Sequence, residues 1–242
     1  GRRNMDILKK KADTLRLLLF AFCGISLCQF TYFMAIEASN AGTATVLQYL
    51  SPVLILLVVC FREKRYPGWL ELAAIFLSLL GTFVLGTHGN IHTFYITGNA
   101  LFWGLAAAVS SVLYNMIPGS LILRYDIYQV LGFGMFFGGV LMCVLFRPWE
   151  YELIWDTETG AALISVIVIG TAVAFGLYLQ GVSMIGPLKG SILASVEPLS
   201  AVIISVFWLG TSFAPADFLG FGMILGLSLI HISEPTRRVV IS

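Results

Sequence analysis

The sequence predicts an all-α membrane protein, a polytopic bundle of transmembrane helices. Three observations lead to this prediction: 58% of the 242 residues are hydrophobic, only 11% are charged, and the apolar residues occur in long runs. A soluble domain carries about 25% charged and about 45–50% apolar residues. The composition therefore excludes a soluble enzyme and a disordered protein, and the net charge of +1 leaves no basic excess for binding nucleic acid.

Eight segments are long and apolar enough to cross a bilayer, whose hydrocarbon core requires about 20 apolar residues per helix. They are 15–36, 42–61, 69–87, 97–117, 127–146, 161–183, 189–209 and a last segment that begins at 216. The connections between them are short and contain helix-ending residues, as in Tyr66-Pro67-Gly68. The sequence lacks the alternating strands of an outer-membrane barrel, so a helix bundle is the expected fold.

Lysine and arginine residues predict the orientation. If the segments alternate in direction, eleven of these residues lie on one side: Arg2, Arg3, Lys9, Lys10, Lys11, Arg16, Arg62, Lys64, Arg65, Arg124 and Lys189. The opposite side has only Arg147, next to several acidic residues. Because basic loops stay in the cytoplasm, we expect the N-terminal end of this chain to be cytoplasmic. The short helices and sparse loops are typical of a prokaryotic inner membrane.

The two ends of the sequence differ from an ordinary coding sequence. The chain starts with Gly1 rather than methionine, and residues 227–237 (LSLIHISEPTR) resemble a translated adapter used in preparing sequencing libraries. We interpret 227–242 as a non-native tail and assign no function to it.

The chain contains an internal repeat. A shift of 146 residues aligns Gly24 with Gly170, Tyr32 with Tyr178, Leu47 with Leu193, Pro52 with Pro198 and Phe61 with Phe207. The shift moves the first segment onto the sixth, an odd offset, so the two copies should cross the membrane in opposite directions. Inverted repeats of this kind recur in secondary transporters. If each repeat has five helices, eight of ten expected spans are visible: 1–87 holds the last three helices of the first repeat and 97–226 the second repeat.

Two stretches resemble the EamA-type repeat. The first is SNAGTATVLQYLSPV, followed by Glu63 and LLGTFVLG, and the second is SILASVEPLSAVIISVFWLG with its Glu-Pro pair. The resemblance covers residues 15–226 and is to the drug/metabolite transporter superfamily. It implies ten helices in two inverted five-helix repeats, and transport of a small metabolite, an amino acid or a drug-like compound. One departure is that Gly210-Thr211-Ser212 replaces the acid that Glu63 supplies in the first repeat.

Glu197 is the most informative single position. At about 1.5 Å per residue from Lys189 it lies roughly 12 Å into its helix, near the middle of the bilayer. An ionisable group there costs about 3 kcal/mol, so it requires a partner or a wet cavity. We expect Glu197 to couple transport to protons or to bind a cationic substrate; the alternative is a neutral acid that bonds a neighbouring helix.

Pro52 and Pro198 predict breaks at corresponding places of the two repeats. A proline inside a helix frees the carbonyl four residues earlier, here Gln48 and Ala194. Broken helices in matching positions are a good indication of a transporter's binding site, although a static kink is the alternative. The candidate site residues are Glu197, Gln48, Ser51, Pro52 and Pro198, with weaker support for Gln29, Tyr32, Tyr178, Trp103 and Tyr114. The weaker group contains aromatic residues that more often belong to a core or face lipid.

The predicted function is secondary transport by alternating access around a site between the Pro52 and Pro198 helices. The sequence has no ATP-binding P-loop, so a proton gradient or exchange is the expected driving force. We expect no enzyme activity, cofactor or metal, because no histidine or acid pair lies inside a credible span and the cysteines lack metal-ligand spacing. The expected partners are a small-molecule substrate, the lipid bilayer and protons, with a homodimer left open. The alternative is a passive channel or a non-transporting membrane subunit.

Overall fold

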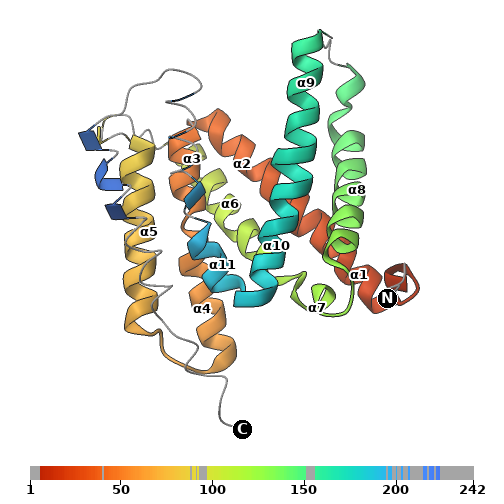
Figure 1. Ribbon diagram of the computed structural model, residues 1–242, viewed down its shortest axis with the longest axis horizontal. Coiled ribbons are helices and arrows are strands. Elements are labelled where there is room, and N and C mark those ends of the chain that lie inside the picture. Colours follow the sequence, from red (N-terminus) through yellow and green to blue (C-terminus); the bar gives the residue numbers. More distant parts are fainter. Residues whose placement is uncertain are drawn as a thin grey trace. The chain divides into compact units, whose positions relative to one another are not determined.

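The protein is helical throughout the part of the chain that the structure describes. The computed structural model describes residues 6–39, 41–87, 89, 90, 92, 97–150, 156–194, 196, 197, 200, 203, 207, 215, 216, 218–220, 222 and 223, and none of these lies in a strand. The predicted all-α bundle is therefore confirmed (Figure 1). The main elements are α1 (Lys11–Leu19), the π-helix η2 (Phe20–Ser26), α2 (Leu27–Ala38), α3 (Ala41–Gln48), α4 (Ser51–Glu63), α5 (Trp69–Thr87), α6 (Gly98–Met116), α7 (Gly119–Ile122), α8 (Ile127–Phe146), α9 (Thr157–Ser165), the π-helix η5 (Val166–Val173), α10 (Ala174–Ile185) and α11 (Pro187–Leu193).

Five continuous helical stretches are long and apolar enough to cross a membrane. They are Lys11–Ala38, Thr43–Glu63, Gly98–Ile122, Ile127–Phe146 and Thr157–Ile185, and the shorter apolar helix Trp69–Val84 forms most of α5. These six coincide with predicted segments to within a few residues. Parts of the segment 189–209 and of the segment from 216, and all of the tail 227–242, lie outside the described residues.

The order of elements repeats along the chain with the predicted offset. α1, η2, α2 and α3 begin at residues 11, 20, 27 and 41, and α9, η5, α10 and α11 begin at 157, 166, 174 and 187. Three of the four starts differ by 146 residues and the other by 147. The opposite direction of the two copies stays a prediction.

Both repeats contain a π-helix at the same place, which the hydropathy pattern does not reveal. In each, a side-chain hydroxyl group also bonds a carbonyl five residues earlier, the same spacing as the backbone hydrogen bonds of a π-helix. The Ser26 hydroxyl donates to the Ala21 carbonyl at 2.9 Å, and the Thr171 hydroxyl donates to the Val166 carbonyl at 2.9 Å. Both copies therefore contain this rare local structure and a hydroxyl group that bonds within it, although Ser26 and Thr171 are not repeat equivalents.

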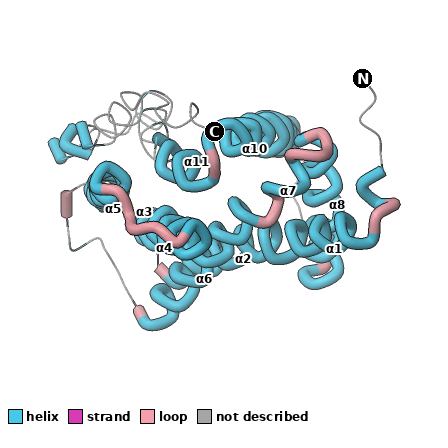
Figure 2. The backbone as a smooth tube through the Cα atoms, turned by 90° about the horizontal axis from the view of Figure 1, so that it is seen from below, coloured by secondary structure: helices cyan, strands magenta, loops and turns pink. Residues whose placement is uncertain are grey.

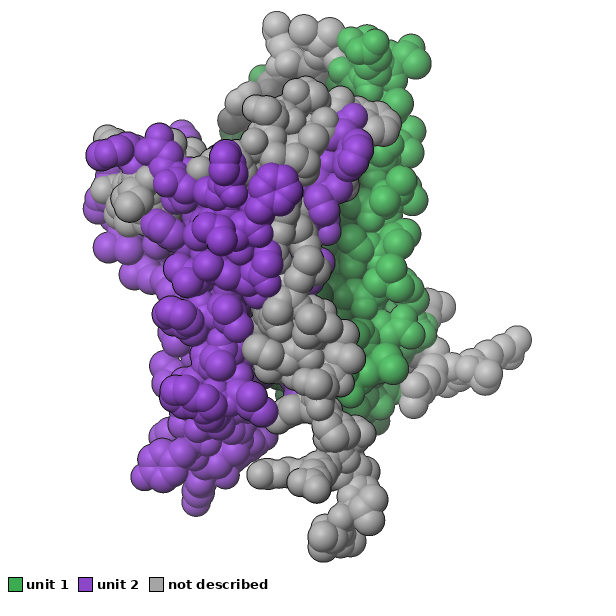
Figure 3. Space-filling model, turned by 60° about the vertical axis from the view of Figure 1, so that its left-hand side comes forward, with its two compact units in different colours: residues 1–30, 110–187 green, residues 31–109, 188–242 purple. Residues whose placement is uncertain are grey.

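The chain divides into two compact units, which are described separately (Figure 3). Unit 1 consists of residues 1–30 and 110–187, and its hydrophobic core gathers around Phe20. Within it, α8 packs on η2. A Cβ atom added to Gly138 would lie 2.6 Å from Ser26 Oγ and 3.1 Å from the Ala21 carbonyl oxygen, so only glycine permits this approach. Gly134 and Gly138 thus form a packing surface on α8.

Unit 2 consists of residues 31–109 and 188–242, and in it α3 packs on α5. The short loop from α4 to α5, visible in Figure 2, is held by Arg65. Its guanidinium group donates two hydrogen bonds of 2.7 Å to the carboxylate of Glu71 and also pairs with Glu63. The bonds to these two carboxylates raise the pKa of Arg65 further above its ordinary value. This loop fixes the distal end of α4, whose first turn belongs to the candidate site.

Candidate functional site

The candidate residues fall into two groups, because they belong to two different units. Unit 2 holds Glu197, Gln48, Ser51, Pro52, Pro198, Tyr32 and Trp103, and unit 1 holds Gln29, Tyr114 and Tyr178. The structure therefore supports two local clusters, which we treat one at a time.

The first helix break lies between α3 and α4, where the sequence predicts it. α3 ends at Gln48, residues 49 and 50 form a turn, and α4 begins at Ser51 with Pro52 in its first turn. A proline is well accommodated there because its missing N–H would have no helical partner. Ser51 and Pro52 are buried and Gln48 is half-buried. The predicted kink is thus a two-residue turn between α3 and α4, inside the continuous stretch Thr43–Glu63, and we call it the first break.

The second break lies at the end of α11, in the matching place of the other repeat. α11 ends at Leu193 and a turn follows at Ala194, whose carbonyl accepts the Glu197 N–H at 2.9 Å. Pro198 lies outside the described residues. As a proline it has no N–H, so it cannot donate the helical hydrogen bond that the Ala194 carbonyl would otherwise accept.

Tyr49 joins the two breaks. Its hydroxyl group donates a 2.7 Å hydrogen bond to the Ala194 carbonyl and lies 3.4 Å from Glu197 Oε2. The residue Tyr49 is only 8% exposed, whereas Glu197 is among the exposed residues. The Ala194 carbonyl, which Pro198 cannot bond, thus accepts both the Glu197 N–H and a phenol from the first break. Sequence reasoning identified this carbonyl but missed Tyr49. The available signal was that Tyr49, a hydrogen-bond donor, lies three residues before Pro52, the proline of the other repeat.

Tyr32 of α2 extends the polar cluster in unit 2. Its hydroxyl group lies 2.8 Å from Thr45 Oγ1, and the Thr45 carbonyl accepts the Tyr49 N–H at 2.9 Å. Tyr32 also interacts electrostatically with Glu197. Four polar side chains from three stretches of unit 2 therefore surround the two breaks: Tyr32, Thr45, Tyr49 and Glu197. Trp103 of α6 is half-buried and packs edge-on against Phe102, with ring centroids 5.1 Å apart.

The second cluster lies in unit 1, where two tyrosine rings stack. The rings of Tyr114 and Tyr178 are 6.1 Å apart with an interplanar angle of 19°. The Tyr178 hydroxyl donates to Asn115 Oδ1 at 2.6 Å, and Asn115 Nδ2 donates to the Ser111 carbonyl at 2.9 Å. The Tyr114 hydroxyl is buried and has no hydrogen-bond partner in the described structure. Gln29 is exposed on α2.

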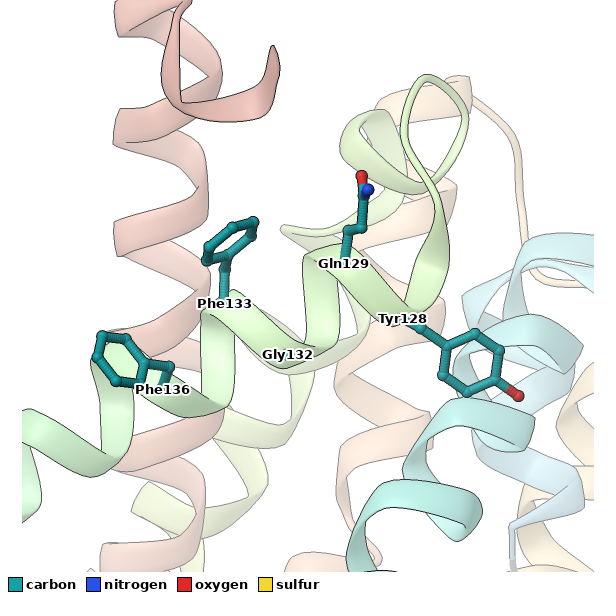
Figure 4. A pocket seen from close by; sticks show the side chains of 5 residues that line it. All are labelled: Tyr128, Gln129, Gly132, Phe133 and Phe136. Carbon is teal, nitrogen blue, oxygen red and sulfur yellow. The ribbon is translucent and has the colours of Figure 1, made fainter. Parts of the chain in front are cut away.

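A shallow hollow of about 440 Å³ lies along α8, and none of the residues that line it is a predicted site residue. It is lined by Tyr128, Gln129, Gly132, Phe133 and Phe136, all from this one helix (Figure 4). Two phenylalanine rings and an open glycine position suit contact with apolar chains. Within the described part of the chain, no group of three His, Cys, Asp or Glu residues is arranged to hold a metal ion.

Comparison with known proteins agrees with the helical architecture and its repeat. The profile of the EamA-like transporter family matches residues 2–87 and 98–232. The inner membrane transporter YicL of Salmonella typhimurium is 41% identical over 238 residues, which cover 98% of this chain and 79% of that protein. A probable terminal-alkyne amino-acid exporter of Streptantibioticus cattleyicolor is 27% identical over 203 residues, covering 82% of this chain and 66% of the exporter.

A crystal structure of another protein has the same fold. It superposes with a TM-score of 0.73 at 19% sequence identity and covers 95% of this chain and 79% of the other. At this identity the likeness concerns the fold alone, whereas the family match spans most of the sequence. The chain therefore belongs to the EamA-like transporter family and is a membrane transporter.

Proposed function

We propose that this protein is a secondary transporter that works by alternating access, with its substrate site at the two helix breaks of unit 2. The observation that supports this best is the 2.7 Å hydrogen bond from Tyr49 to the Ala194 carbonyl. It joins two residues that are 145 positions apart in sequence, one at each break. Interrupted helices expose backbone carbonyls and N–H groups at membrane depth, where polar substrates can replace them as partners.

Glu197 is the proposed coupling group. It lies one residue before Pro198, it belongs to the exposed residues of unit 2, and its described side-chain partner is the Tyr49 phenol. An acid at this depth with an uncharged partner can exchange a proton with water or with a cationic substrate. The neutral alternative, an acid that only bonds its neighbour, requires no exposure.

The proposed substrates are small metabolites, with amino acids first. A relative described as a terminal-alkyne amino-acid exporter supports this order, and the amino group of such a compound could pair with Glu197. The proposed location is the bacterial inner membrane, which agrees with the Salmonella relative. The distribution of lysine and arginine supports a cytoplasmic N-terminal end of the chain.

Transport by purified protein in proteoliposomes tests the proposal. Uptake of an amino-acid and metabolite panel is measured with and without an imposed pH gradient, for wild type, Glu197→Gln and Glu158→Gln. Glu158, in the first turn of α9, is an exposed acid outside the cluster and serves as the matched control. We expect saturable, gradient-driven flux in wild type and Glu158→Gln, and loss of the gradient dependence in Glu197→Gln.

Two results would contradict the proposal. Flux that never saturates would indicate a channel, and gradient-driven flux that persists unchanged in Glu197→Gln would remove the coupling role of Glu197. Loss of flux in Glu158→Gln as well would show that the substitutions act through folding.

A further inference from the structure

We infer that Tyr49 is a positioning residue that holds the two breaks together. Its phenol has one O–H donor, for which the Ala194 carbonyl and the Glu197 carboxylate are competing acceptors. The protonation state of Glu197 therefore determines whether the two breaks stay joined. The inference rests on the proposed role of Glu197 and adds the device through which a proton would act. It concerns residues of unit 2 alone.

The distances decide where the phenol proton is in the described state. A phenol has one O–H donor and also accepts through its oxygen. The short 2.7 Å contact to the Ala194 carbonyl is a donated hydrogen bond, and the 3.4 Å contact to Glu197 Oε2 is beyond the usual range for an O–H···O bond. In this arrangement Glu197 does not hold the phenol proton. The arrangement is that expected for a protonated, neutral Glu197, which competes weakly as an acceptor.

Loss of the Glu197 proton reverses the competition. A carboxylate is a much stronger acceptor than an amide carbonyl, and hydrogen bonds to ionised groups are roughly twice as strong as neutral ones. The phenol O–H then rotates toward Oε2, which is already within reach. The phenol keeps its covalent O–H bond throughout, and the only proton released leaves the Glu197 carboxyl group for solvent or substrate.

As a consequence, the hydrogen bond from Tyr49 to the backbone carbonyl of Ala194 no longer joins the two breaks. The Ala194 carbonyl retains the Glu197 N–H as a donor at 2.9 Å but loses the phenol. Tyr49 is then held by a flexible side chain instead of by the rigid turn at the end of α11. The first and second breaks can separate, which is the local movement that alternating access requires.

The other titratable groups near this site support a single proton-sensitive group. Among the described residues, Tyr32 of α2 is the further phenol that interacts with Glu197, and it is engaged with Thr45. Lys189, in the first turn of α11, interacts with Glu71 of α5, two turns away from Glu197. Neither phenol is ionised near neutral pH, so Glu197 is the acid of this cluster that can lose a proton.

Hydrogen exchange of the second break tests the inference without any substrate. Amide exchange of a peptide covering residues 193–200 is followed by mass spectrometry at a series of pH values, for full-length protein in lipid nanodiscs. The variants are wild type, Glu197→Gln, Tyr49→Phe, and Tyr66→Phe as the control. Tyr66 is an exposed loop tyrosine. Dividing each rate by that of Glu197→Gln at the same pH removes the intrinsic pH dependence of exchange.

We expect this ratio to be near one for wild type and Tyr66→Phe at low pH and to rise about tenfold as Glu197 ionises, the effect of losing one hydrogen bond. Tyr49→Phe should exchange rapidly at every pH, with a flat ratio. A flat ratio in wild type overturns the inference even if Tyr49→Phe does not fold, and a pH-dependent ratio in Tyr49→Phe overturns it as well.

The outcome is separable from that of the transport assay. A rising ratio in a protein without gradient-driven flux would support the switch and contradict proton-coupled transport. Coupled flux with a flat ratio would support the transporter and refute the role of Tyr49.

Discussion

At the scale of residues, tyrosine hydroxyl groups differ in whether they have a hydrogen-bond partner. In an apolar helix bundle a buried polar atom has no water to bond, so each must find a protein partner or cost stability. Tyr49 and Tyr178 have such partners, and Tyr114 has none in the described structure. The three tyrosines should therefore respond differently to the loss of their hydroxyl groups.

Tyr114 and Tyr178 form a matched pair for this prediction. Tyr178→Phe leaves Asn115 Oδ1 without its donor and should destabilise the protein by about 1–3 kcal/mol. Tyr114→Phe removes a buried, unpaired hydroxyl and should leave stability unchanged or raise it by up to about 1 kcal/mol. Thermal unfolding in detergent measures both. An equal loss in Tyr114→Phe would mean that its hydroxyl bonds a group that the described residues do not include.

Elements in the two repeats have the same order but different surroundings. Gly24 in η2 and Gly170 in η5 are repeat equivalents. A Cβ atom on Gly24 would lie 2.9 Å from the Phe20 ring and 3.3 Å from Tyr114 Cα, whereas at Gly170 no atom of the described residues would lie within 4 Å. The same local structure is thus closely packed in the first copy and open in the second.

The two glycines predict opposite effects of one substitution. Gly24→Ala should cost about 1–3 kcal/mol through overpacking. Gly170→Ala should be neutral or stabilising by up to about 1 kcal/mol, because alanine favours helix and meets no neighbour. The measurement is the apparent melting temperature of each variant in detergent. A loss in Gly170→Ala as large as that in Gly24→Ala would show that another helix covers η5.

The elements also show how far the sequence could predict the fold and the site. The six described spans and the first break follow from apolar length and from Pro52, because both are local properties of the chain. The π-helices do not follow, since their hydropathy is that of an α-helix. Tyr49 and Asn115 were missed because their partners, Ala194 and Tyr178, are 145 and 63 residues away.

At the scale of the whole molecule, the candidate spans leave most of their apolar residues unburied. In each span, at most 44% of the residues of its most apolar 18-residue window are buried inside the protein, and in Thr157–Ile185 only 11% are. The remaining apolar surface would be untenable in water, so it must face lipid or further helices. This agrees with an integral membrane protein. Whether two copies associate through such surfaces stays a prediction.

Cross-linking the two breaks tests the central claim, that they separate during each transport cycle. Leu50→Cys and Leu193→Cys place thiols beside Tyr49 and Ala194, after Cys23, Cys28, Cys60 and Cys143 are replaced by alanine. A short, reducible bifunctional thiol reagent joins the pair, and mass spectrometry measures its yield. We predict that complete cross-linking abolishes flux, that reduction restores it, and that either single-cysteine variant stays active. Undiminished flux through fully cross-linked protein would contradict the account.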